Sequence, residues 1–148
     1  MSQSDKHRAL VLETVYTLEI RYPRISIVSD MQAVPGDTVP PIIDGFRPDV
    51  YGRALSGDLT VIAEAKTDGD LDNNHTMEQI VSFINYLERK KDGLFILSVT
   101  GCRADFSKTL MRFLLLGMEV TSTQIMVFDS LDFWRYVVTN GGFQWRLS

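Results

Sequence analysis

Three charged residues lie where a buried strand is expected to end. The stretch "VIAEAKT", residues 61–67, begins with small and branched apolar residues and then places Glu64 and Lys66 two positions apart. The upstream stretch "RPDVYG" carries Asp49, and the two segments are joined around "LSGD". Burying an unpaired charge is costly, so these three residues are candidates for chemistry.

The turn between the two segments predicts how their side chains face each other. A hairpin centred between Ser56 and Gly57 places Asp49 directly opposite Glu64, with Cβ atoms about 4.5–5.5 Å apart. Period-two alternation puts Lys66 on the same face. Two adjacent carboxylates repel each other unless a positive group lies between them.

A divalent cation is such a group, and Mg²⁺ prefers oxygen ligands. Lys66 is then placed to orient or deprotonate a water at the metal. The sequence thus predicts a metal site with a nucleophilic water. The alternative is a simple ion pair at the strand end between Glu64 and Lys66, with Asp49 as a turn residue.

The spacing of apolar residues, glycines and prolines predicts the elements that position these charges. We expect the following, in chain order: a helix over residues 4–22, a strand over 24–30, a loop over 31–41, strands over 46–53 and 58–67, a polar loop over 69–74, a helix over 76–91, a strand over 93–101, a helix over 106–118, a strand over 122–130, a short final helix over 131–138, and a tail, 141–148, that adds an edge strand or packs against the rest.

This order predicts an α/β fold with a central mixed sheet flanked by helices, its core ordered αβββαβαβ. The hairpin implies antiparallel pairing, and the later strands alternate with helices, which implies parallel pairing with right-handed crossovers. The length of 148 residues suits one domain, residues 1–148.

Composition limits the class of protein but not its chemistry. Hydrophobic residues make up 45% of the chain and charged residues 23%, as in an ordinary soluble protein. No apolar run is long enough to span a membrane, and the N-terminus lacks the core of a signal peptide. The single cysteine, Cys102, excludes an internal disulfide and fits a reducing compartment, so we expect a cytoplasmic protein.

The combination of "RPDVYG" and "VIAEAKT" resembles the motif of the PD-(D/E)XK nuclease superfamily, whose members share the restriction-endonuclease-like fold. The resemblance implies that Asp49 and Glu64 are carboxylate ligands of Mg²⁺, which Mn²⁺ can replace. It implies that the carbonyl of Ala65 is a further ligand and that Lys66 positions the attacking water. The implied activity is metal-dependent hydrolysis of DNA phosphodiester bonds.

Two further positions follow from the resemblance. Many members have a glutamate on the first helix that reaches the metal; Glu13 and Glu19 both qualify, and Glu13 lies nearer the middle of the helix. Many also have a glutamine after the E-x-K motif, matched here by Gln79. A capping box with Thr76 as the N-cap and Gln79 at N3 explains that glutamine equally well. Asp44 is an accessory ligand or, as we prefer, an ordinary loop residue.

The expected partner is nucleic acid, most simply DNA. The net charge of −4 argues against indiscriminate coating of nucleic acid. Arg47 and Arg53 share the face of Asp49 by alternation and are candidates for phosphate contacts. No helix-turn-helix, zinc-finger or RNP signature is present, so structure-selective cleavage fits better than readout of a base sequence. A homodimer would allow both strands of a duplex to be cut.

Two other functions are compatible with these residues. The first is a catalytically inactive module that binds nucleic acid or protein on the same fold, because function lives in the site and not in the fold. The second is glycoside hydrolysis by Asp49 and Glu64 as a retaining pair, which Lys66 beside them makes remote.

Overall fold

The computed structural model describes residues 3–30, 39–55, 57–67, 71 and 73–148. Within these residues the helices and strands follow the order α1 (Gln3–Arg21), β1 (Ile25–Ser29), β2 (Val50–Ala54), β3 (Leu59–Lys66), α2 (Asn74–Glu88), β4 (Asp92–Val99), the short 3₁₀ helix η1 (Gly101–Arg103), α3 (Ala104–Leu116), β5 (Gln124–Phe128), β6 (Phe133–Thr139) and β7 (Gly142–Leu147). No helix among them is long and apolar enough to cross a membrane.

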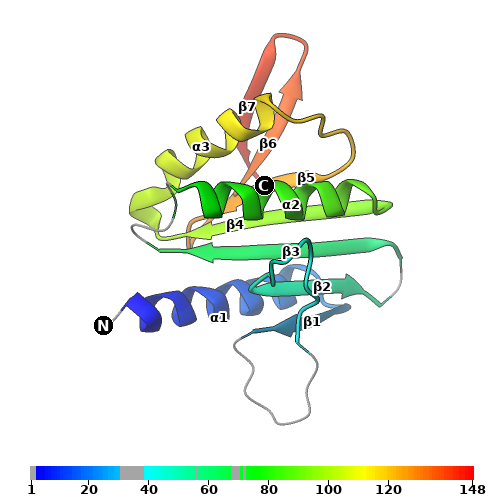
Figure 1. Ribbon diagram of the computed structural model, residues 1–148, viewed down its shortest axis with the longest axis vertical. Helices are drawn as coiled ribbons and strands as arrows, with labels where there is room; N and C mark the ends of the chain where they lie inside the picture. Colours follow the sequence, from blue (N-terminus) through cyan, green and yellow to red (C-terminus); the bar gives the residue numbers. More distant parts are fainter. Residues whose placement is uncertain (1–2, 31–38, 56, 68–70, 72) are drawn as a thin grey trace.

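The described strands form one seven-stranded sheet in which the spatial order follows the chain, β1 to β7 (Figure 1). The pairs β3–β4 and β4–β5 are parallel, and the other four pairs are antiparallel. Helix α1 packs on one face of the sheet, and α2 and α3 pack on the other. The predicted mixed α/β fold is therefore confirmed, and the sheet has more strands than the predicted core.

The prediction of a final helix over residues 131–138 is wrong. The chain forms strand β6 there and turns back into β7, with Thr139 paired with Gly142. Asn140 and Gly141 are thus the two residues of a tight hairpin turn, and the following Gly142 has a φ of 135°, which glycine adopts readily. Aromatic and β-branched residues such as Trp134 and Val137 also suit a strand. The alternative prediction of an edge strand for the tail is confirmed by β7.

Helix α1 buries one stripe of side chains and positions the residues at its N-terminal end. Leu10, Val11, Val15 and Leu18 are buried at helical spacing against the sheet, as the sequence predicts. The small residues Ala63 and Ala65 of β3 belong to the same cluster. The first turns of α1 therefore lie beside the end of β3.

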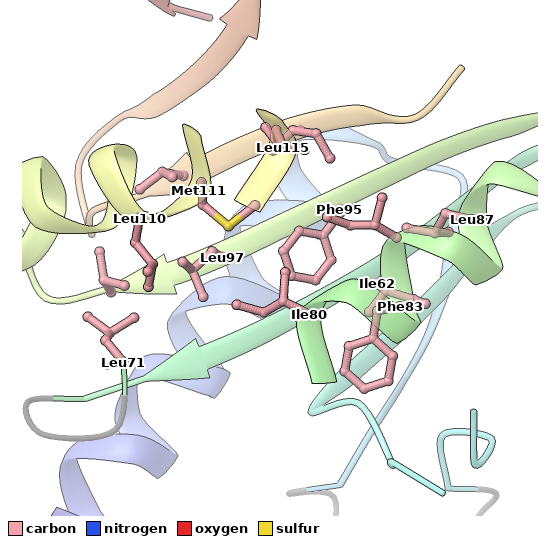
Figure 2. Close-up of a cluster of buried hydrophobic side chains, with 14 of the residues drawn as sticks. Ile62, Leu71, Ile80, Phe83, Leu87, Phe95, Leu97, Leu110, Met111 and Leu115 are labelled. Carbon is pink, nitrogen blue, oxygen red and sulfur yellow. The ribbon is translucent and has the colours of Figure 1, made fainter. Parts of the chain in front are cut away.

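The opposite face of the sheet holds the larger cluster, which Figure 2 shows in part. Ile80, Phe83 and Leu87 of α2 pack over Ile62 and Phe95, the side chains that β3 and β4 direct toward this helix. These residues are fully buried. Burial of this kind stabilises by roughly 1.5–3 kcal/mol per large apolar side chain. The packing fixes α2 along β3 and β4 with its N-terminal end near the end of β3.

Two predicted loops are only partly described. Most of the predicted loop 31–41 and much of the polar loop 69–74 lie outside the described residues. The part that is described includes Leu71, which is buried in the larger cluster, and Asn73, the N-cap of α2. Both residues belong to the connection between β3 and α2.

A carboxylate at the end of α2 holds the connection between α3 and β5. Glu88 Oε1 accepts hydrogen bonds from the amide and hydroxyl of Thr121, and Oε2 accepts them from those of Ser122 and Thr123. Burial opposes ionisation of this group, but these hydrogen bonds outweigh it and lower the pKa of Glu88 from 4.5 to about 2.

We expect Glu88→Gln to destabilise the protein at neutral pH by about 1 kcal/mol, because the amide cannot accept all of these hydrogen bonds and water partly screens this half-buried group. The lowered pKa means that the contribution is complete above the unfolded value near 4.5 and is lost as the pH falls toward about 2. Urea unfolding at neutral pH and near pH 2.5 measures this loss. The exposed Glu119→Gln is the control, and an equal effect of both changes would contradict the prediction.

Candidate functional site

The register of β2 and β3 is the one that the sequence predicts. Val50 pairs with Ala63 and Arg53 with Thr60 in the antiparallel ladder. One position beyond the last pair, Asp49 comes opposite Glu64. Both carboxylates are buried, with 9% of Asp49 and 2% of Glu64 exposed.

The backbone of each strand binds the carboxylate of the other. The amide of Asp49 donates to Glu64 Oε1 at 2.8 Å, and the amide of Ala65 donates to Asp49 Oδ2 at 2.9 Å. These reciprocal bonds fix both side chains, because charge-assisted hydrogen bonds to backbone amides are stronger than neutral ones. The two carboxylates are thus held next to each other at the strand ends.

Lys66 completes this arrangement on the same side. Its Nζ lies 3.6 Å from Glu64 Oε2 and donates a hydrogen bond to Gln79 Oε1 at 2.9 Å. Only 14% of the lysine side chain is exposed. Glu64, Lys66 and Gln79 therefore form a connected set in which the glutamine directs the ammonium group.

The capping explanation for Gln79 is wrong. The N-cap of α2 is Asn73, whose side chain accepts a hydrogen bond from the amide of Thr76 at 2.8 Å. Thr76 is therefore the third residue after the cap, not the cap itself. Because the helix begins three residues earlier than the capping box requires, Gln79 is free of that role and its carbonyl oxygen reaches Lys66.

Burial dominates the electrostatics of the pair. It raises the pKa of Glu64 well above the ordinary value of 4.5, and the charge of Asp49 raises it further. The charge of Lys66 and the hydrogen bonds from the Asp49 amide and from Lys66 lower the pKa of Glu64, but they offset only part of the rise. A cation bound between Asp49 and Glu64 would favour the ionised form of Glu64 and so lower its pKa.

His7 is a further residue at the site, and it is not among the candidates that the sequence analysis names for it. Its Nε2 lies 3.2 Å from Asp49 Oδ2, and 28% of its side chain is exposed. His7 precedes Val11, Thr14 and Leu18 at helical spacing, so it extends the buried stripe of α1 toward the strand ends. That periodicity is the signal in the sequence that points to it.

The structure does not bring Glu13 to the carboxylate pair. Glu13 is half-buried on α1, and its side chain has no hydrogen bond or ion pair within the described residues. Glu19 is exposed further along the same helix. In the described ranges, no group of three or more His, Cys, Asp or Glu residues is arranged to hold a metal. His7, and not Glu13, is the α1 residue that contacts Asp49, because the packed face of the helix includes His7.

The remaining acid candidate, Asp44, lies in a turn. Ile43 and Phe46 form an isolated antiparallel bridge, and Asp44 between them is exposed with a φ of 51°. Aspartate tolerates this left-handed backbone better than most residues. The structure therefore places Asp44 in an exposed turn.

The donor set fits a hard divalent cation that keeps several waters. Two carboxylates are the usual protein share of a Mg²⁺ site, with water and substrate phosphate supplying the rest. Ala65 contributes its amide to Asp49, while a role for its carbonyl as a ligand stays a prediction. A buried carboxylate pair with an adjacent ammonium is able to hold such an ion and orient a water.

Comparison of the chain with models of protein families, with curated proteins and with solved structures found no match. The geometry of the site is therefore the basis for assigning its chemistry. That geometry consists of the contacts among Asp49, Glu64, Lys66, Gln79 and His7.

We expect Glu64→Gln to raise the thermal unfolding midpoint of the metal-free protein at about pH 8. The change removes a buried charge and leaves an oxygen that accepts the Asp49 amide. Because the folded-state pKa of Glu64 is raised, the wild type is stabilised by the proton at low pH and loses this stabilisation as the pH rises through that pKa.

The advantage of the variant should therefore be small near pH 4.5 and grow with pH. Melting curves recorded in EDTA across this range measure it, and Glu78→Gln, an exposed position on α2, is the control. An advantage that does not change with pH would contradict the assignment of the raised pKa to Glu64.

Proposed function

We propose that the protein is a metal-dependent nuclease of the PD-(D/E)XK type that hydrolyses DNA phosphodiester bonds, acting as an endonuclease. The observation that carries the proposal is the approach of Lys66 Nζ to 3.6 Å from Glu64 Oε2 while the Asp49 amide binds the other oxygen of Glu64. A lysine, two carboxylates and a supporting glutamine at adjacent strand ends match what metal-assisted hydrolysis requires.

Asp49 and Glu64 would hold Mg²⁺ or Mn²⁺, with the carbonyl of Ala65 as a further ligand. When bound, such an ion supplies a Lewis acid for the phosphate and lowers the pKa of bound water. The ammonium of Lys66 orients the attacking water and stabilises the negative charge that develops on the phosphate oxygens. Gln79 keeps Lys66 directed at this position through its hydrogen bond.

The raised pKa of Glu64 supports a cationic ligand. Burial and the neighbouring charge of Asp49 make the ionised pair unfavourable without a counter-charge, and Lys66 offsets this only in part. Such strongly perturbed groups are typical of functional sites. A divalent cation would supply the missing positive charge and would itself be held more tightly where water is largely excluded.

A second candidate is the inactive binding module, and one observation favours it. Asp49 Oδ2 and Glu64 Oε1 already accept backbone amides, so the carboxylates are partly satisfied without a metal. A scaffold would need no more than that. Against it, the hydrogen bond of Lys66 to Gln79 directs an ammonium group at the pair, which a scaffold does not require.

We expect Asp49→Asn and Lys66→Ala to abolish cleavage of DNA, by at least about 100-fold, a typical loss when one electrostatic stabiliser is removed. The assay uses labelled duplex, single-stranded, flap and four-way-junction DNA with Mg²⁺, Mn²⁺ or EDTA. Lys91→Ala changes an exposed lysine paired with Asp58 and is the matched control.

Cleavage that requires metal, that the wild type and Lys91→Ala both carry out, and that both site variants lose would support the nuclease. Unchanged cleavage by either site variant would refute the assigned roles. A folded wild type that binds no Mn²⁺ in a calorimetric titration and cuts no substrate would favour the inactive module.

We expect His7→Ala to lower the activity by about 10- to 100-fold, the usual effect of removing a partner that orients a metal ligand. The physical reason is its contact with Asp49 Oδ2, which fixes that carboxylate together with the Ala65 amide. The Mn²⁺ affinity measured by calorimetry should fall with the activity. Glu13→Ala is the matched control on the same helix, and an equal loss in both variants would contradict a specific role for His7.

A further inference from the structure

The face of β2 that carries Asp49 continues toward a hollow about 410 Å³ in volume. Tyr51 and Arg53 alternate with buried Val50 and Gly52, so they lie on the same side of the strand as Asp49. Four residues of strand separate Asp49 from Arg53, about 13 Å. The hollow is lined by Ser26, Val28, Val39, Pro41, Tyr51, Arg53 and Tyr86.

A pair of tyrosines supplies hydrogen-bond donors at this hollow. The hydroxyls of Tyr51 and Tyr86 lie 3.0 Å apart. Each hydroxyl carries one proton and only one of the two protons is used between them, so the second is left to donate to a ligand. Burial and the bond to Tyr86 raise the pKa of Tyr51 to about 12, so its hydroxyl stays protonated at neutral pH.

Positive charge gathers at the same place. Arg53 lines the hollow and has no carboxylate partner within the described residues. Lys90 Nζ lies 4.8 Å from the centre of the Tyr86 ring, and the guanidinium of Arg89 lies 5.9 Å from it. No acidic residue is among the described residues that line the hollow. A ligand here is therefore expected to be anionic.

The walls of the hollow also select for a flat, partly apolar group. Val28, which pairs with Tyr51 in the ladder of β1 and β2, and Pro41 line it together with the aromatic residues. A nucleotide combines a phosphate for Arg53 with a base for the apolar and aromatic walls. A base within a duplex is stacked and paired and does not enter such a hollow, whereas an unpaired base does.

We propose that this hollow binds one unpaired nucleotide of the strand whose phosphodiester bond is cleaved at Asp49 and Glu64. Arg53 contacts its phosphate, and Tyr51 and Tyr86 contact the base. This rests on the proposed function, and it makes that function more specific: the substrate is single-stranded at the site, as in a flap, a branch or a frayed end.

The test measures binding separately from cleavage. A fluorescent single-stranded oligonucleotide containing 2-aminopurine is titrated with the Lys66→Ala protein, which should not cut it, and with the same protein carrying Tyr51→Phe, Arg53→Ala or Tyr86→Ala. We expect Arg53→Ala to weaken binding about tenfold and to lower the salt dependence by about one phosphate contact. Tyr86→Ala should weaken binding about 5- to 100-fold and remove the 2-aminopurine quenching that stacking causes.

Lys91→Ala in the same background is the control, since this exposed lysine follows Lys90 but does not line the hollow. Tyr51→Phe keeps the ring and removes only the hydroxyl, which separates loss of a donor from loss of packing. Melting curves show that each variant is folded.

The outcomes distinguish this proposal from the proposed function. If the wild type cuts no substrate but binding and quenching depend on Arg53 and Tyr86, the nucleotide-binding hollow is supported and the proposed nuclease activity is refuted. Cleavage by the wild type with unchanged binding in the Arg53 and Tyr86 variants would support the nuclease and overturn the subsite. Equal affinity for duplex and single strands, or no binding of single strands, would also overturn it.

Discussion

The burial of Glu64 beside Asp49 is the constraint on which the arrangement of the site depends. Two carboxylates that are nearly excluded from water are unfavourable as a pair, and the raised pKa of Glu64 reflects this cost. The structure offsets it with two backbone amides and the ammonium of Lys66. Each of these groups has to be in place for the ionised pair to exist, which links the site to the register of two strands.

That register in turn depends on what covers each face of the sheet. A slip by one residue would move Glu64 to the face of α1 and expose Ala63 and Ala65 to α2. The small alanines allow α1 to approach β3 closely, while Ile62 on the other face packs under α2. The same packing that fixes the register also delivers His7 from α1 and Gln79 from α2 to opposite sides of the strand ends. The two hydrophobic clusters therefore determine the geometry of the polar site.

The parts of the site that the sequence predicts are those fixed by local spacing. A short turn and strict alternation determine that Asp49 and Glu64 are opposite and that Lys66 shares their face, and the register confirms this pairing. Leu12, Tyr16 and Ile20 are exposed apolar residues on the outer side of α1, so the helix has apolar residues beside its buried stripe as well as within it. The resemblance implies a glutamate on this helix, and Glu13 is preferred over Glu19 because it lies nearer the middle, whereas the residue that reaches Asp49 is His7.

Two other errors have physical causes of the same kind. The segment of residues 131–138 has apolar residues that suit a helix or a strand, and its pairing with β7 decides in favour of the strand. Asn73 and Thr76 are both able to cap α2, and the capping bond of Asn73 to the Thr76 amide decides between them. In the first case pairing with another strand determines the structure, and in the second the capping bond of a neighbouring residue does; the local sequence does not contain either contact.

The hydrogen bonds at the pair also limit how a metal would be held. Asp49 Oδ2 accepts the Ala65 amide and contacts His7, and Glu64 Oε1 accepts the Asp49 amide. Among the described contacts this leaves Asp49 Oδ1 and Glu64 Oε2 as the oxygens available to a cation, and Lys66 lies 3.6 Å from the second. Lys66 and a divalent cation would therefore share Glu64 Oε2 or divide the site between them. The hydrogen bond from Lys66 to Gln79 would hold the ammonium group if a cation took this oxygen, so Lys66 would give up Glu64 Oε2 without leaving the site.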